Sequence, residues 1–86
     1  MTYVVTFTAS AAREVRKLDR PVRSRLLEAI ESLGSQPRPH GCIKLAEEER
    51  AWRIRVGDHR VIYEIDDGVL VVTVIRAAHR REANRP

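Results

Sequence analysis

Three arginines are the strongest candidates for chemistry in this chain. Arg53 and Arg55 alternate with apolar residues along segment 51–56, and Arg60 follows just after Gly57-Asp58. A Gly-first two-residue turn favours a tight type II′ hairpin, in which Arg55 would face Arg60. The three guanidinium groups would then share one sheet face, although like charges placed directly opposite one another are unfavourable. This arrangement indicates a polyanionic partner, and we expect that partner to be RNA.

The other face of the same hairpin is apolar and aromatic. With Gly57-Asp58 at the turn, Val56 pairs with His59 and Trp52 pairs with Tyr63, so these side chains lie together. We expect Trp52 and Tyr63 to belong to the core rather than to stack on bases. His59, at the tip of the hairpin, is expected to have a structural role.

The elements that would cover this apolar face come earlier in the chain. Residues 3–7 are β-branched and aromatic, which predicts a first strand. Thr8 or Ser10 would cap a helix that runs to about Leu18, and Pro21 suits the first turn of a second helix that Gly34 ends. The apolar stripes are predicted at Ala12, Val15 and Leu18 on the first helix, and at Val22, Leu26, Leu27, Ile30 and Leu33 on the second.

The remaining segments complete an α+β fold. Residues 35–49 are predicted to form a loop, 69–75 a last strand, and 76–86 a basic tail. The order β-α-α-β-β-β predicts a helical hairpin packed on one face of a mostly antiparallel four-stranded sheet. Residues 1–86 would form a single domain whose other sheet face stays open.

Composition limits the class of protein. The net charge is +4, and Lys17 and Lys44 are the only lysines among 16 basic residues. A basic balance is modest evidence for an anionic partner. The single Cys42 excludes an intramolecular disulfide framework and, without a Cys/His cluster, argues against a zinc site. We expect a cytosolic protein, because no membrane span or signal peptide is evident.

The chain resembles the RelE/ParE superfamily of type II toxin–antitoxin toxins over nearly its whole length. The resemblance rests on Lys44-Leu45, on the segment from Trp52 to Val56, on the Gly-Asp-x-Arg-Val-x-Tyr motif at 57–63 and on residues 78–82. It implies the fold predicted above. It also implies one of two activities, because RelE-like members cut mRNA in the ribosomal A site and ParE-like members inhibit DNA gyrase.

For the RelE-like activity, the resemblance implies a set of site residues. Four arginines match the catalytic constellation, in which a ribose 2′-OH attacks the adjacent phosphate: Arg53, Arg55, Arg60 and Arg80. Arg60 would clamp the phosphate, and Arg80 would stabilise the transition state or help the leaving oxygen. Further basic residues would bind RNA, namely Lys44, Arg76, His79 and Arg81, although the side of the sheet that Arg76 occupies depends on the length of the preceding turn.

The sequence departs from the family pattern at two positions. Arg55 stands where a relative can use Lys as the base, and a guanidinium is a poor general base. Asn84 is the nearest match to a late Tyr that many RelE-like toxins carry. The base would then be His79, Glu82 or a ribosomal RNA group, or the chain is not a nuclease.

Three functions therefore remain open at this point. The first is a ribosome-dependent mRNA endonuclease, without metal or small-molecule cofactor, that a RelB-like antitoxin inhibits. The second is a ParE-like gyrase inhibitor without a nuclease site. The third is an inert module that binds only the antitoxin. The basic face favours the first function, because a pure interaction protein need not keep Arg opposite Arg.

Overall fold

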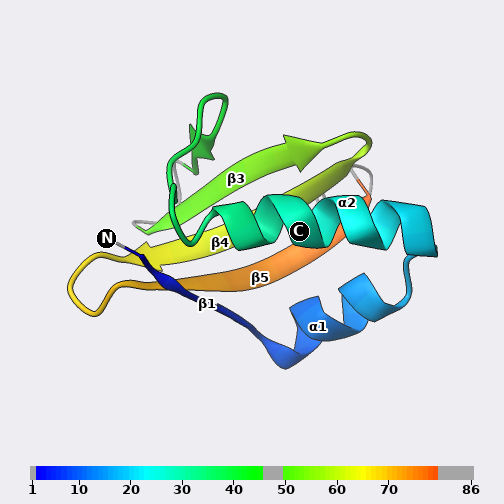
Figure 1. The fold of residues 1–86 in the computed structure, drawn as a ribbon, viewed down its shortest axis with the longest axis horizontal. Helices are drawn as coiled ribbons and strands as arrows, with labels where there is room; N and C mark the ends of the chain where they lie inside the picture. The colour runs from blue at the N-terminus through cyan, green and yellow to red at the C-terminus, as the bar shows by residue number, and fades with distance from the viewer. Residues whose placement is uncertain (1, 46–49, 80–86) are drawn as a thin grey trace.

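The computed structural model of the chain describes residues 2–45 and 50–79. Seven elements follow one another along the chain: β1 (Val4–Phe7), α1 (Ala9–Arg16), α2 (Arg20–Ser32), β2 (Ile43–Lys44), β3 (Ala51–Val56), β4 (His59–Asp66) and β5 (Val71–His79). The strands form one sheet in the order β1-β5-β4-β3-β2 (Figure 1). Only β1 and β5 pair in parallel among these strands. The α+β fold is thus confirmed.

The predicted number of strands was wrong, because the sheet has five strands rather than four. The additional strand β2 lies within the segment that was expected to be a loop, and it pairs Ile43 with Arg53 and Lys44 with Trp52. Two residues are too few to produce a period-2 pattern, so the sequence gives no signal for this strand. Strand β5 also extends to His79, beyond the predicted end at Ile75.

The helix boundaries follow from local chemistry. The Thr8 hydroxyl accepts a hydrogen bond from the Ala11 N–H at 3.1 Å and caps α1, so Thr8 rather than Ser10 is the N-cap. Pro21 lies in the first turn of α2, where its missing N–H costs nothing. At Gly34, a Cβ would lie 3.1 Å from the carbonyl oxygen of Tyr3, so a side chain there would require the N-terminal segment to shift slightly.

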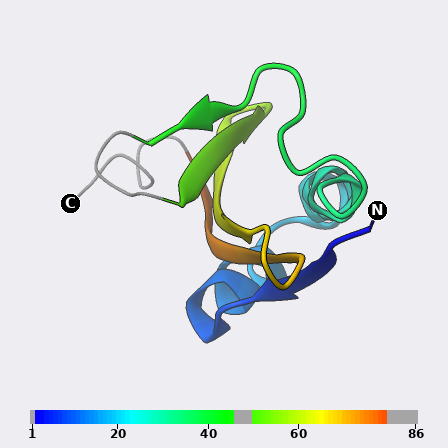
Figure 2. The ribbon, with the colours of Figure 1, turned by 90° about the vertical axis from the view of Figure 1, so that its left-hand side faces the viewer.

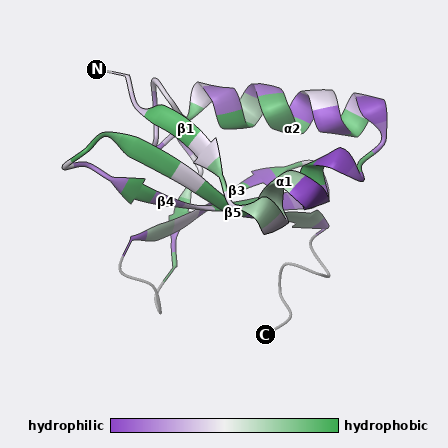
Figure 3. Cartoon of the chain, turned by 90° about the horizontal axis from the view of Figure 1, so that it is seen from below, coloured by the Kyte–Doolittle hydropathy of each residue, from purple (hydrophilic) through white to green (hydrophobic). Residues whose placement is uncertain are grey.

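Both helices pack on the sheet through one shared core, and Figure 2 shows α2 (cyan) end-on beside the strands. Along α2, hydrophobic and hydrophilic residues alternate in Figure 3, as expected of a helix with one apolar side. The core between the layers is formed by residues of both helices and of β3, β4 and β5: Ala11, Val15, Leu26, Ile30, Leu33, Ile54, Val61, Tyr63, Ile65, Val72, Val74 and Ala77. Leu27 was wrongly predicted to belong to this core, since it is 40% exposed. Within the described part of the chain, no helix is long and apolar enough to cross a bilayer.

The β3–β4 hairpin has the predicted register. Val56 pairs with His59, Arg55 with Arg60, and Trp52 with Tyr63. Gly57 has φ +60°, whereas Asp58 is not in the positive-φ region, which is the pattern of a type II′ turn. This turn fixes which side chains of the hairpin reach the core.

A β-bulge shifts the register between β4 and β5. Ile62 pairs with Arg76, but Tyr63 pairs with Val74, so Ile75 is the extra residue on β5. The buried Tyr63 donates its hydroxyl to the carbonyl oxygen of Pro37 at 2.8 Å, which anchors the segment after α2 to the sheet. Burial raises the pKa of Tyr63 above its ordinary value.

Candidate phosphate-binding face

The open side of the β3–β4 hairpin carries Arg53, Arg55 and Arg60, which we call the basic face. The register puts all three on the side opposite the core residues Ile54, Val61 and Tyr63, as the sequence predicted. Arg55 faces Arg60 directly, and Arg53 faces Ile62. Three delocalised cations on one surface favour an anion that can accept several paired hydrogen bonds, such as a phosphodiester.

The guanidinium groups of the basic face lie in different environments. Arg55 is exposed, and its Nε donates to the carbonyl oxygen of Gly57 at 3.1 Å, so the side chain follows the hairpin turn. Arg53 and Arg60 are partly buried. Neither Arg53 nor Arg55 forms an ion pair with any residue in the described ranges. Glu64 is two residues beyond Ile62 on β4, so it shares this side of the sheet.

Lys44 does not join the basic face. It pairs with Trp52, whose side chain is on the helix side of the sheet, so the register turns Lys44 to that side as well. There it lines a polar cleft of about 390 Å³ together with Arg38, Arg50 and Trp52. The guanidinium carbon of Arg38 lies 5.2 Å from the centre of the Trp52 ring, which is a cation–π distance.

The same cleft contains a network that joins three distant segments. Arg38 pairs with Asp67 at 2.8 Å, and the Tyr3 hydroxyl donates to the same carboxylate at 2.6 Å. Hydrogen bonds from Arg38 and then from Tyr3 lower the pKa of Asp67 below its ordinary value. The network holds the N-terminal segment and the β4–β5 turn against the segment between α2 and β2.

Arg76 is bound to α1. Its guanidinium lies 3.3 Å from the carboxylate of Glu14, and the other oxygen of that carboxylate accepts the N–H of Ala77 at 3.0 Å. The register places Arg76 opposite Ile62, which settles the side that the sequence left undecided. Glu14 therefore neutralises one predicted RNA-binding residue and also satisfies an amide of β5 that β1 does not reach.

His79 lies on the side of the sheet that the helices cover. It pairs with His59 across β4 and β5, and the two ring centres are 5.6 Å apart in an edge-to-face arrangement. Lys17 and Leu18 line the adjoining cavity of about 340 Å³. Arg80 and Arg81, with the alternative base Glu82 and with Asn84, lie outside the described residues.

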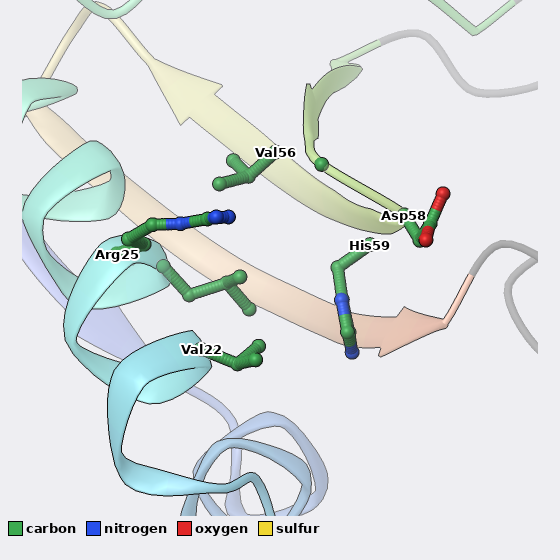
Figure 4. A pocket seen from close by; sticks show the side chains of 7 residues that line it. Val22, Arg25, Val56, Asp58 and His59 are labelled. Atoms are coloured by element: carbon green, nitrogen blue, oxygen red, sulfur yellow. The ribbon is translucent and has the colours of Figure 1, made fainter.

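Arg25 was not identified from the sequence. It extends from α2 towards the end of β3, where it lines a small cavity of about 190 Å³ with Val22, Val56 and His59 (Figure 4). Its Nη2 atom would lie 3.8 Å from a Cβ at Gly57, so it approaches the hairpin from the helix side. The alternating pattern of a strand cannot reveal such a contact, because it depends on how the helix packs.

Chemically, the described residues offer cations but no metal cluster. No group of three or more metal-binding side chains is found in ranges 2–45 and 50–79. The basic face could bind a phosphate and stabilise additional negative charge on it. Among the residues placed above, Glu64 is the one on this face whose side chain could act as a general base.

Comparison with known proteins gives consistent similarities. Residues 5–84 match the family described as the ParE toxin of the type II toxin–antitoxin system parDE. The chain is 31% identical to Toxin RelG of Mycobacterium tuberculosis, over 99% of each chain. It is 33% identical to Toxin RelE of the same organism, over 96% of this chain and 87% of that protein.

Solved structures give the same result. The structure is similar to a chain of the RelBE2 toxin–antitoxin complex from Mycobacterium tuberculosis, with TM-score 0.80 and 30% identity, covering 93% of this chain and 100% of the other. A free Escherichia coli RelE mutant gives TM-score 0.81 and 27% identity, covering 96% of this chain and 88% of the other. A chain of an archaeal RelE–RelB complex from Pyrococcus horikoshii gives 0.82 and 28%, covering 93% and 97%.

Proposed function

Because the chain belongs to the RelE/ParE family of type II toxin–antitoxin toxins, we propose that it is a ribosome-dependent mRNA endonuclease. The observation that carries the proposal is the basic face, on which Arg55 is directly opposite Arg60. The guanidinium groups of this face offer several donors on one surface, and a phosphodiester can accept hydrogen bonds from more than one of them. The names RelG and RelE of the two curated relatives support the same activity.

The proposed reaction is an internal transesterification. The 2′ oxygen loses its proton and attacks the adjacent phosphorus, the bond from phosphorus to the 5′ oxygen breaks, and the 5′ oxygen takes up a proton. The products are a 2′,3′-cyclic phosphate and a 5′-OH. Arg60 would bind the phosphate, while Arg53, Arg55 and Arg80 would stabilise the charge that builds up on its oxygens.

Positioning and charge stabilisation would supply most of the rate. A guanidinium does not lose its proton in proteins, so none of the four arginines is a strong base. The ribosome would therefore have to hold the substrate and supply the geometry that this small open face lacks. Lys44 could contact the same RNA only if the strand passes around the β2 edge, because Lys44 lies on the other side of the sheet.

A translating extract tests this proposal. We expect cleavage in the A site with cyclic phosphate ends, insensitive to EDTA when it is added after ribosome assembly at constant free magnesium. Purified protein should barely cut naked RNA. Rapid cleavage of free RNA would contradict dependence on the ribosome.

A second function is favoured by one specific observation, which is that the matching family is described as ParE. In that case the chain would inhibit DNA gyrase and leave translation intact. A supercoiling assay with purified gyrase distinguishes the two functions. Inhibition of supercoiling together with unchanged translation would replace the nuclease proposal.

The partner we propose is a RelB-like antitoxin, since the similar chains from Mycobacterium tuberculosis and Pyrococcus horikoshii were solved in toxin–antitoxin complexes. An acidic or amphipathic segment of the partner would cover part of the basic face or displace the segment 76–85. An antitoxin segment that binds Arg76 would have to replace the ion pair of Arg76 with Glu14.

A further inference from the structure

The turn between the two helices carries a second concentration of positive charge, distinct from the basic face. Six basic residues fall within residues 13–25, and we call them the helical patch: Arg13, Arg16, Lys17, Arg20, Arg23 and Arg25. Only two acidic residues lie in the same segment, Glu14 and Asp19. The segment therefore has a net charge of +4, which equals that of the whole chain.

The charges of the helical patch face solvent without carboxylate partners. Five of the six side chains are exposed and Arg23 is half-buried. None of the six forms an ion pair with a residue of the described ranges. Of the two carboxylates in the segment, Glu14 is directed to Arg76 and the Ala77 N–H, and Asp19 forms no ion pair with a described residue. The fold thus uses the acidic residue of α1 on β5 and leaves its basic residues exposed.

The helical patch lies at the same end of the molecule as the tip of the β3–β4 hairpin, as Figure 1 shows. Arg25 reaches the cavity beside Val56, and Lys17 lines the cavity beside His59 and His79. Positive charge therefore continues from the basic face, around this end of the sheet, to the helix side. A ligand on the helical patch could be bound at the same time as a ligand on the basic face.

The composition of the helical patch favours a phosphate backbone over a protein partner. Protein interfaces have apolar and aromatic centres and few charges there. The exposed large hydrophobic residues of the described chain all lie outside residues 13–25: Val4, Phe7, Leu27, Ile43 and Val69. The segment also lacks an aromatic residue on which an unpaired base could stack. Double-helical RNA, in contrast, is recognised largely through its backbone.

We propose that the helical patch binds the phosphate backbone of a double-helical RNA segment, separately from the strand that the basic face would cut. This inference rests on the proposed function only in that the duplex would belong to the ribosome. The patch would then orient the protein on structured RNA, and the basic face would act on the single strand.

The test is binding to a synthetic RNA duplex of about 16 base pairs, measured by fluorescence anisotropy at several salt concentrations. Arg16→Gln with Arg20→Gln should weaken binding by roughly tenfold or more at 0.1 M salt, and should lower the slope of log K against log salt by about 2. The charge-preserving pair Arg16→Lys with Arg20→Lys should bind like the wild type, because both residues would act through charge.

The matched control changes the net charge equally in the segment that follows α2. Ser35→Glu with Gln36→Glu alters two exposed positions outside the patch, and it should leave the salt slope unchanged. An equal loss in this control would overturn the proposal, since only overall charge would matter. Unchanged duplex binding together with weaker antitoxin binding in the Arg16/Arg20 variant would also overturn it, because the patch would then serve a protein partner.

Assays in translating extract separate this inference from the proposed function. If the wild type cuts mRNA but the Arg16/Arg20 variant binds the duplex normally, the helical patch inference fails and the nuclease proposal stands. If the variant loses duplex binding but the wild type cuts nothing, the nuclease proposal fails and the inference stands. Thermal melting followed by circular dichroism confirms that each variant is folded.

Discussion

Arg60 is the residue whose substitution should separate catalysis from folding. Replacing Arg60 with Ala removes the proposed phosphate clamp from the side of the sheet opposite the core. We expect mRNA cleavage to fall by roughly 100-fold or more, with little change in melting temperature. The matched control is Arg50→Ala, at an exposed arginine that pairs with Asp66. A fall in melting temperature that parallels the loss of activity would instead mark Arg60 as structural.

Arg55 tests whether the site uses charge alone. Lysine keeps the cation and, among guanidinium groups, its pKa is depressed, so it can also accept a proton. We therefore expect Arg55→Lys to keep or raise the rate of cleavage in a translating extract. The bond from the Arg55 Nε to Gly57 would be lost in this variant. A large drop in rate, with normal ribosome binding, would show that the bidentate geometry of arginine is essential.

Among the elements, the β3–β4 hairpin depends on one glycine. Gly57 has φ +60°, a conformation that costs an L-residue about 1–2 kcal/mol. We expect Gly57→Ala to lower the free energy of unfolding by about that amount, as measured by urea denaturation. Gly57→Asn should cost less, because Asn tolerates positive φ. Asp58→Ala is the control at the neighbouring turn position, and an equal effect there would rule out the conformational explanation.

The hairpin was predictable from sequence, whereas other elements were not. Apolar alternation and a Gly-first dipeptide together define one register, so the shared face of Arg53, Arg55 and Arg60 followed directly. Strand β2 is too short to have a pattern, and the side on which Lys44 lies depends on its pairing with Trp52. Lys44, which was predicted to bind RNA, therefore could not be assigned to a side of the sheet from the sequence.

The end of β5 shows a second reason why sequence patterns are insufficient. The position of the Arg76 side chain depends on a bulge at Ile75 and on the ion pair with Glu14 of α1, neither of which has a local signature. For the helical patch, the sequence shows the residues and the structure shows that they lack a carboxylate partner within the described ranges. Its basic residues are evident in the sequence, but only the packing of α1 shows that Glu14 does not neutralise them.

On the scale of the whole molecule, Asp67 holds together segments that are far apart in the chain. Its pKa is lowered from about 3.8 by Arg38 and Tyr3, so its contribution to stability is present above that pH and is lost as the pH falls further. We expect Asp67→Asn to lower the melting temperature at pH 7, and the difference from wild type to shrink at acidic pH. Asp58→Asn, at an exposed carboxylate, is the control. A difference that persists unchanged at pH 2 would contradict the role of the charge.

The distribution of charge also determines how the antitoxin complex should respond to salt. If acidic segments of the partner cover the basic face, the affinity should fall steadily as ionic strength rises. Titration by isothermal calorimetry at several salt concentrations measures this dependence, and Arg53→Gln should reduce it. A complex that is insensitive to salt and unaffected by Arg53→Gln would place the antitoxin on the helix side instead.

The position of β5 has a consequence for how the protein is made. This strand is the last of the described elements to be synthesised, yet it lies inside the sheet between β1 and β4. Among the described strands, β1 pairs only with β5, so the β1 ladder has no partner strand until Val71–Val74 has been synthesised. Folding during translation therefore cannot proceed from the N-terminus alone. A nascent chain therefore cannot complete the described sheet until Val71–His79 has been translated.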